Sequence, residues 1–321
     1  MEITSSKAAP PPVDFSQVAL PGAIVSNAWP QARSTEGATL RAIEEVLANY
    51  PLFEGFQTLD VPYPAERRAI GRLLAGRKRP HTYTLTRLLT EHQVNLSSLD
   101  PDNRRRAVAI ATACFDDAAE AGAGIVGFIS GPRPADPAQR PAALAALEDS
   151  LTQLATAAAA HHPNLELVIE PLDYEAHKRN TLGTTAEAVA ICCRLAAKNL
   201  RLALCLDTSH LLLNEEDPVA AAGLARGFIP EFHFCNPVKD RASPLYGDQH
   251  PPFGAPGVVG VEEVATIMAG LHRAGYLTAA MRPRVYAEVL KPAHLDSLAV
   301  IGHCQDTLLS GWARARQLLA S

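Results

Sequence analysis

The sequence predicts a single (β/α)8 barrel. Eight short apolar runs each precede a longer segment with helical periodicity, and no long linker divides the chain. No glycine-rich phosphate-binding motif follows any of these runs, which counts against the nucleotide-binding α/β folds. Such alternation requires a parallel sheet, and eight units of this size suit a closed barrel better than an open sheet. We therefore expect a flexible N-terminal tail over residues 1–16 and a barrel domain over residues 17–321.

Each element follows from its local pattern. In the segment 39–49, for example, Leu40, Ile43 and Val46 fall on one face of a helix. The turn and capping residues Ser98-Leu-Asp-Pro-Asp102 open the helix expected at 104–121. In chain order, the expected strands are residues 23–27, 55–60, 83–89, 125–130, 165–170, 202–207, 229–235 and 285–289. The helices that follow them are expected at 39–49, 65–74, 104–121, 144–154, 185–197, 218–226, 261–275 and 296–319.

The composition excludes several classes of partner. Twenty-nine basic and 34 acidic residues give a formal charge of −5, so nothing in the charge balance favours nucleic acid or an anionic membrane. The six cysteines form no CxxC pair and lie mostly in apolar stretches, as is typical of reduced core cysteines. The chain has no signal-peptide pattern at its start and no run of 18 apolar residues. We therefore expect a cytoplasmic protein that does not bind membranes.

Four successive apolar runs in the second half of the chain end in a residue that can bind a metal ion. These residues are Glu170, Asp207, His233 and Glu288. In a barrel, the carboxyl ends of all strands meet at the face that carries the active site. A single carboxylate there could equally cap a helix or form a salt bridge. Three converging carboxylates, however, repel one another unless a cation lies between them. The pattern therefore predicts one divalent ion, with Mn²⁺ expected and Mg²⁺ or Co²⁺ as alternatives.

Two glutamates beside one ion suggest a reaction. An ion that polarises a carbonyl or hydroxyl oxygen lowers the pKa of the adjacent C–H group. One glutamate can then remove that proton, and the other can return a proton. The expected outcome is isomerisation, epimerisation or β-elimination of a polyol or sugar.

At these residues the sequence resembles the xylose isomerase-like superfamily of sugar isomerases and epimerases, and within it the ketose 3-epimerases of the D-tagatose/D-psicose type. The resemblance runs from about residue 23 to residue 319. Its matching stretches are Asn95-Leu-Ser-Ser-Leu-Asp-Pro-Asp102, Glu170-Pro-Leu-Asp173, Asn180-Thr181, Leu206-Asp-Thr-Ser-His210, His233 and Glu288. The resemblance implies that Glu170, Asp207, His233 and Glu288 bind the ion, that Glu170 and Glu288 transfer the proton, and that His210 contacts substrate oxygens.

The sequence departs from the epimerases at substrate-contacting positions. Ala176 stands where they carry glutamate, while Asn236 and Lys239 stand where they carry glutamate and arginine, with Arg241 nearby. Because these changes do not touch the four metal-binding positions, we expect the metal chemistry to be kept. The identity of the sugar does not follow from the resemblance. We expect the substrate-binding residues to be His210, Lys239, Arg241, Tyr246 and Trp29.

One loop favours an alternative substrate. The segment Tyr246-Gly-Asp-Gln-His-Pro251 resembles the loop of superfamily members that act on 3-oxo-glycosides, including C-glycoside deglycosidases. Those enzymes use the same enolisation to expel an aglycone and work with a small second subunit. In this interpretation His250 is a catalytic residue that donates a proton to the leaving group, and Trp29, Tyr246, Pro252 and Phe253 form an apolar wall. The partners expected are thus a sugar or a glycoside, together with a second copy of the chain or a small subunit.

Two other classes of barrel protein fit the sequence less well. A phosphodiesterase of the endonuclease IV type shares the barrel, but it needs several metal ions and a basic DNA-binding surface, and this acidic chain supplies neither. A non-catalytic barrel would not need both glutamates. The basic cluster Arg104-Arg-Arg106 is interpreted as a solvated helix face and His161-His162 as an exposed turn.

Overall fold

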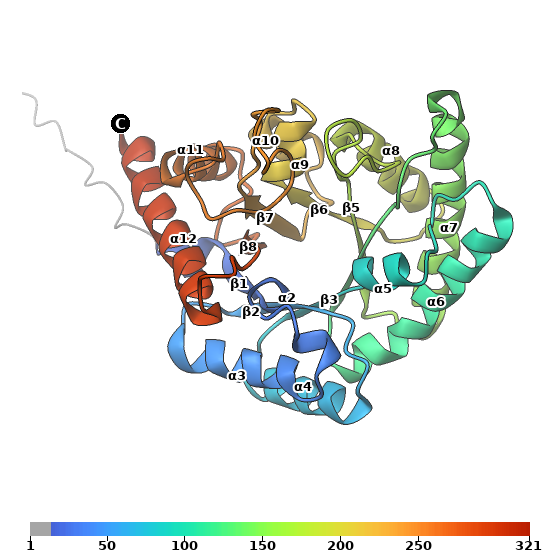
Figure 1. Ribbon diagram of the computed structural model, residues 1–321, viewed down its shortest axis with the longest axis horizontal. Helices are drawn as coiled ribbons and strands as arrows, with labels where there is room; N and C mark the ends of the chain where they lie inside the picture. Colours follow the sequence, from blue (N-terminus) through green and yellow to red (C-terminus); the bar gives the residue numbers. More distant parts are fainter. Residues whose placement is uncertain (1–13) are drawn as a thin grey trace, which may run out of the picture.

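Eight parallel strands close into a barrel in the computed structural model, which describes residues 14–321. Each strand pairs with its successor and β8 pairs with β1, so the (β/α)8 prediction is confirmed (Figure 1). The strands are β1 (Leu20–Ile24), β2 (Gly55–Leu59), β3 (His81–Thr84), β4 (Ile125–Ile129), β5 (Glu166–Glu170), β6 (Ala203–Asp207), β7 (Glu231–Cys235) and β8 (Arg284–Glu288).

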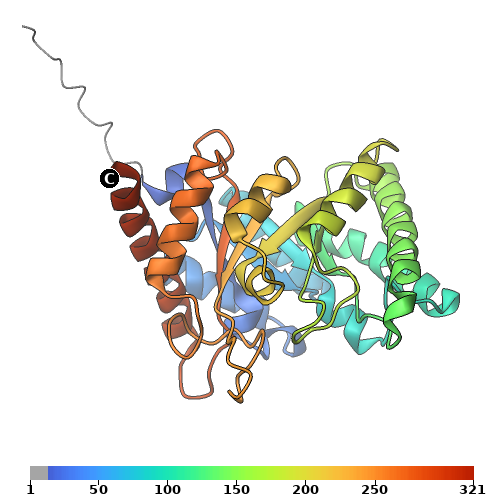
Figure 2. The ribbon, with the colours of Figure 1, turned by 90° about the horizontal axis from the view of Figure 1, so that it is seen from above.

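Helices surround the ring of strands (Figures 1 and 2). The principal helices are α3 (Ala38–Asn49), α4 (Pro64–Gly76), α6 (Pro101–Glu120), α7 (Arg140–His161), α8 (Thr185–Ala196), α10 (Pro218–Leu224), α11 (Val261–Arg273) and α12 (Ser297–Ala320). Shorter pieces are α1 (Phe15–Val18), α2 (Val25–Ala28), α5 (Thr86–Glu91), α9 (Thr208–Leu213) and the 3₁₀ turns η1 (Ala32–Ser34) and η2 (Pro137–Gln139). None of the helices described is long and apolar enough to cross a membrane.

Two predicted strands differ from those observed. The prediction of a strand over residues 83–89 is wrong in its second half, because β3 ends at Thr84 and α5 follows it. The change occurs at Leu85, whose backbone N–H still bonds to Gly127 of β4, while the N–H of Leu89 bonds back to Leu85. A short apolar run cannot by its pattern distinguish these two states. The first strand lies three residues earlier than predicted, and α2 occupies most of the segment assigned to it.

The packed domain also begins before the boundary predicted at residue 16. Phe15 is 2% exposed and its ring packs against Trp312 of α12, with 5.8 Å between ring centroids. Residues 15 and 16 therefore pack with the barrel domain. In the rest of the predicted tail, Asp14 is exposed and residues 1–13 lie outside the described residues.

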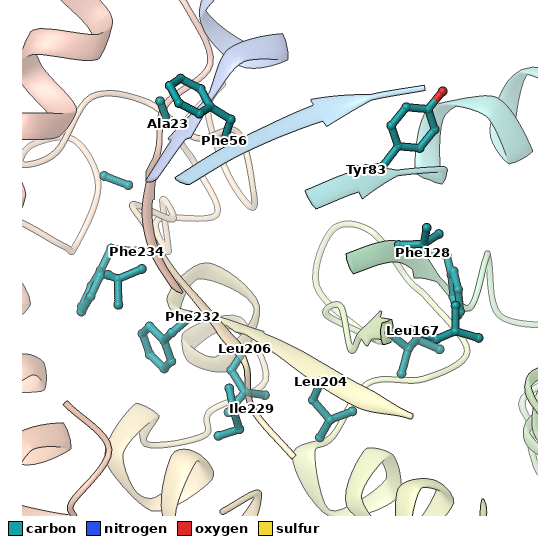
Figure 3. Packing of buried hydrophobic residues seen from close by; sticks show 14 of the residues in the cluster. Ala23, Phe56, Tyr83, Phe128, Leu167, Leu204, Leu206, Ile229, Phe232 and Phe234 are labelled. Atoms are coloured by element: carbon teal, nitrogen blue, oxygen red, sulfur yellow. The ribbon is translucent and has the colours of Figure 1, made fainter. Parts of the chain in front are cut away.

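Strand alternation separates an apolar outer face from a polar interior. Phe232 and Phe234 of β7 are fully buried and face the surrounding helices (Figure 3). Because side chains alternate along a strand, Glu231, His233 and Cys235 point into the barrel. The neighbouring strand β8 follows the same order, since its register pairs Glu231 with Arg284 and Cys235 with Glu288. The barrel interior thus offers layers of polar side chains below and at its mouth.

The lower interior is filled by one aromatic ring and one polar network. A Cβ atom on Gly22 of β1 would lie 2.1 Å from Cε1 of Tyr286, so only glycine leaves room for that ring. Beside it, Glu231 accepts a hydrogen bond from the Thr82 hydroxyl (2.5 Å) and lies 3.6 Å from the Arg284 guanidinium. The floor under the barrel mouth is therefore closely packed and carries paired charges.

Candidate metal centre

The four predicted ligands lie at the carboxyl-terminal mouth of the barrel. Glu170, Asp207 and Glu288 are the last residues of β5, β6 and β8, and His233 is the central residue of β7. The register places Asp207 beside His233. Each strand reaches its ligand after a run of buried residues, so the fold holds the backbone of each ligand rigidly.

Their side chains converge. Asp207, His233 and Glu288 offer ligand atoms that all lie within 4.8 Å of one another. Glu170 offers an atom within the same spacing of Asp207 and His210, and another group of this spacing contains Glu170, Cys205 and His233. The structure thus brings the four residues into one cluster, with two cysteines beside them.

Glu288 lies among three nitrogen donors. Asn27 donates a hydrogen bond to its Oε1 (2.8 Å), Nδ1 of His250 lies 3.1 Å from the same oxygen, and Nδ1 of His233 lies 3.2 Å from Oε2. Burial alone would raise the pKa of this carboxyl. The positive charges of His250 and His233 outweigh that effect and hold the pKa of Glu288 well below its ordinary value. Glu288 is therefore a carboxylate at neutral pH.

Asp207 is fixed by its own strand end. Its Oδ1 accepts the backbone N–H of Ser209 (2.6 Å), which caps α9, and its Oδ2 accepts the thiol of Cys235 (2.6 Å). The side chain is 1% exposed. Its orientation is therefore set by the protein before any ligand arrives.

Glu170 has fewer partners. Its side chain is 23% exposed, and its nearest cationic group is Nε2 of His210 at 3.9 Å. Burial raises the pKa of Glu170 to about 7, with the charges of Asp207 and Glu288 adding to the effect. Like charges this close repel one another, so the third carboxyl group of the cluster resists ionisation. A cation between the carboxylates would remove this repulsion.

A second row of charges lies behind the four residues. His210 is 3.3 Å from Asp173 and 3.8 Å from Asp248. Asp248 in turn contacts Nε2 of His250 (2.5 Å) and the ammonium group of Lys178 (3.1 Å). Burial opposes the charging of His210, but Asp248 and Asp173 raise the pKa of His210 to about 9. Carboxylates therefore hold the rings of His210 and His250, which in turn contact the candidate ligands Glu170 and Glu288.

The residues present fit a divalent cation. Three carboxylates and one imidazole are the donors that a hard or borderline ion prefers. Oε1 of Gln57, which lines a cleft with Glu170 and His233, is buried and lacks a hydrogen-bond partner among the described residues. A cation held by the cluster would compensate its excess negative charge, and a hydroxyl group bound to that cation would donate a hydrogen bond to Gln57.

The predicted substrate-binding residues divide into two sets. His210 lies in the cluster, as does His250. Lys239, Arg241 and Tyr246 instead line a pocket of about 430 Å³ that none of the four candidate ligands lines, and Lys239 pairs there with Glu215 (3.0 Å). Their assignment to the substrate remains a prediction.

Trp29 is largely buried, and its contact with the substrate remains a prediction. Its side chain is 9% exposed and packs in the apolar core. Asn27, two residues earlier, reaches Glu288 instead. Phe253 packs against His303, with 5.9 Å between ring centroids, and its place in an apolar wall beside the substrate remains a prediction.

Sequence reasoning missed several residues of the site, among them Asn27, Lys178, Glu231 and Cys235. Two of them had a signal, because Glu231 and Cys235 stand two residues before and after His233 and therefore point the same way. Asn27 lies in α2, in a segment that was expected to be a strand, and Lys178 lies in a loop that no periodic pattern predicts. Asn236, which departs from the epimerases, is structural: it donates hydrogen bonds to the carbonyls of Pro252 and Gly254 (both 2.7 Å) and so holds the loop before α11.

Comparisons with known proteins agree with this architecture. Residues 46–297 match the family described as xylose isomerase-like TIM barrel. The chain is similar in structure to L-ribulose 3-epimerase, with 19% identity, a TM-score of 0.69 and coverage of 94% of this chain and 97% of that one. It is also similar to a 3-keto-D-glucoside 4-epimerase from E. coli, with 14% identity, a TM-score of 0.63 and coverage of 90% of this chain and 98% of that one. For D-psicose 3-epimerase from Clostridium cellulolyticum H10 the identity is 16%, the TM-score is 0.65, and the coverage is 93% of this chain and 99% of that one.

These structural likenesses are too low in sequence identity to establish more than the fold, and no curated protein matches the chain. The family match is of a different kind, because it covers more than half of the sequence, including the four strands that carry the cluster, β5, β6, β7 and β8. The chain belongs to the xylose isomerase-like TIM barrel family.

Proposed function

We propose that this protein is a divalent-metal-dependent isomerase or epimerase that moves a proton next to the carbonyl group of a ketose or an oxidised sugar. The ligands in this proposal are Glu170, Asp207, His233 and Glu288, and Mn²⁺ is the ion expected. The observation that carries the proposal is the convergence of three carboxylates and one imidazole at the barrel mouth. When bound, the ion would supply a positive charge that polarises the sugar carbonyl and acidifies the neighbouring C–H group.

The two glutamates are the candidates for proton transfer. They belong to β5 and β8, which are separated by two strands on one side of the ring, so a substrate between them would meet one carboxylate on each side. Glu288 is held ionised by His250 and His233 and is suited to accept a proton. Glu170, on the other side of the substrate, is the candidate for returning a proton.

His210 is proposed to contact substrate oxygens. Asp173 and Asp248 keep its imidazole charged, and its Nε2 lies between Asp248 (3.8 Å) and Glu170 (3.9 Å). A charged donor at that position would bind a hydroxyl or carbonyl oxygen of a sugar placed over the cluster.

The experiment is solvent hydrogen exchange on candidate ketoses in D₂O, followed by mass spectrometry, with the wild type and the Glu288→Gln variant. We expect deuterium to enter the sugar carbon next to the carbonyl with the wild type. The variant should lose exchange by a factor on the order of 10² or more while keeping its fold. Glu262→Gln, an exposed glutamate of α11, is the control. Turnover without exchange, or an active Glu288→Gln variant, would exclude proton transfer by this residue.

A lyase acting on a 3-oxo-glycoside is the second candidate function. It is favoured by the position of His250, which lies within 3.1 Å of Glu288 and 2.5 Å of Asp248. In that reaction a glutamate removes the proton next to the 3-oxo group, and the electron pair of the C–H bond forms an enolate. The enolate then expels the aglycone with the electron pair of its bond to the sugar, and His250 protonates the leaving group.

Parallel assays of the His250→Ala variant separate the two functions. Metal content is verified first, because His250 touches a proposed ligand. Loss of glycoside cleavage with retained epimerisation of a free ketose supports the lyase. Efficient epimerisation by the wild type, with no cleavage of a 3-oxo-glycoside, contradicts it.

A further inference from the structure

A pocket of about 770 Å³ lies at the barrel mouth beside the cluster, on the side of β3, β4 and β5. Its walls are mainly apolar and come from Leu89, Val94, Leu96, Ile129 and Leu172. Leu89 belongs to α5, which lies beside this part of the ring (Figure 1). The volume falls within the range of about 300–1,000 Å³ that small-molecule sites occupy.

The pocket lies next to the proposed metal centre. Ile129 is paired in register with Glu170, so its backbone lies one strand spacing away from that ligand. Leu172 follows Glu170 by two residues. Thr86 lines both the pocket and the small cleft that Glu170 and His233 line. A molecule held over the cluster can therefore extend into this pocket.

The polar groups at the rim of the pocket are largely engaged by the protein itself. The side chain of Asn95 accepts from Ser97 and donates to the carbonyl of Pro132. That of Asn103 accepts from the backbone of Asn95 and donates to Gln93. The ammonium group of Lys178 is bound by Asp248 (3.1 Å).

A sugar ring buried in this pocket would leave hydroxyl groups poorly paired, and that costs free energy. An apolar group would lose no hydrogen bonds there and would gain from leaving water. We propose that the substrate is a sugar bearing an aromatic or similarly bulky apolar substituent, with the sugar over the metal centre and the substituent in the Leu89–Leu172 pocket. This inference rests on the proposed function and names its substrate class.

The test measures binding, so that it does not depend on turnover. The probes are phenyl β-D-glucoside and methyl β-D-glucoside, which differ only in the substituent, titrated into the Mn²⁺-loaded protein in a calorimeter. Thr90→Trp is designed to fill the pocket, because Thr90 is exposed, lines it, and bonds only to its own helix through Thr86. Thr266→Trp on α11 is the matched control, since Thr266 is also exposed and bonds to the preceding turn.

We expect the wild type and Thr266→Trp to bind the phenyl glycoside about tenfold more tightly than the methyl glycoside, or better. In Thr90→Trp this preference should disappear while affinity for the methyl glycoside stays within about twofold. Equal affinities in the wild type, no binding of either glycoside, or a preference that Thr90→Trp leaves intact would overturn the inference.

Failure of this inference is distinguishable from failure of the proposed function. If the protein catalyses solvent exchange on a free ketose but binds the phenyl and methyl glycosides equally well, the proton-transfer proposal is supported and the apolar subsite is excluded. If the protein prefers the phenyl glycoside, Thr90→Trp abolishes that preference, and no ketose undergoes exchange, the apolar subsite is supported and the proton-transfer proposal is excluded.

Discussion

Replacing Glu231 by glutamine should weaken metal binding although Glu231 is not one of the proposed ligands. Glu231 is the first residue of β7 and is 2% exposed. Its Oε1 lies 3.4 Å from Nε2 of His233, whose Nδ1 faces Glu288 at 3.2 Å and Asp207 at 4.0 Å. The carboxylate thus holds the imidazole from behind, with its other nitrogen directed into the cluster.

The size of the effect follows from these contacts. A full charge on each group at this spacing would interact by about 5 kcal/mol at an effective dielectric constant of about 20. Arg284, 3.6 Å from Glu231, offsets part of that interaction. Carboxylates that orient a metal-bound histidine are typically worth about 10–100-fold in metal affinity. We therefore expect Glu231→Gln to raise the Kd for Mn²⁺ by about 10–100-fold, or about 1.4–2.8 kcal/mol.

The variant should still fold. Glutamine keeps the size of the side chain and can accept the hydrogen bond of the Thr82 hydroxyl. Arg284 retains its bonds to that hydroxyl (2.6 Å) and to the carbonyl of His81 (3.3 Å). A general loss of structure would therefore not explain a change in metal affinity.

The assay is competition for Mn²⁺ against a chromophoric chelator, with the urea unfolding midpoint measured in parallel. Glu166→Gln is the control: Glu166 opens β5 below the mouth and its nearest ion-pair partner is Arg201, at 3.7 Å. Equal Mn²⁺ affinities for Glu231→Gln, Glu166→Gln and the wild type would refute the positioning role of Glu231.

Two further predictions concern the barrel itself. Burial lowers the pKa of His81 to about 4 from 6.5, so its contribution to stability is present above pH 6.5 and is lost as the pH falls towards 4. Between about pH 7.5 and pH 5 the wild type should lose about 2 kcal/mol more unfolding free energy than His81→Gln, and equal losses in urea titrations would contradict this. Gly22→Ala should destabilise by about 1–3 kcal/mol because its Cβ would overlap Tyr286, whereas Gly223→Ala, whose Cβ meets open space, should be neutral or stabilising. An unchanged urea midpoint for Gly22→Ala would show that the ring can move.

Much of the fold was predictable because the strands are short apolar runs flanked by helical periodicity. The four candidate ligands were predictable for a related reason. Glu170, Asp207 and Glu288 each end such a run, and a barrel gathers strand ends at one face. Convergence therefore followed from topology and required no knowledge of side-chain conformations.

The surroundings of the cluster were not predictable in the same way. Lys239, Arg241 and Tyr246 were assigned to the substrate because they stand at or near substrate-contacting positions of the resemblance, and the structure gathers them in a pocket that none of the four candidate ligands lines. Their positions depend on the bridge between Val238 and Gly247 and on the turn from Asp240 to Ser243, which no periodic pattern encodes. The structure places Trp29 among the buried apolar residues, where an aromatic ring gains free energy by leaving water.

Anomalous X-ray diffraction from crystals of the protein grown with Mn²⁺ tests the central claim most directly. We expect one strong anomalous peak per chain at the barrel mouth. Oxygen or nitrogen atoms of Glu170, Asp207, His233 and Glu288 should lie about 2.0–2.6 Å from it. The absence of a peak at this position at saturating Mn²⁺, or a peak there whose protein ligands exclude two or more of the four residues, would contradict the metal centre described above.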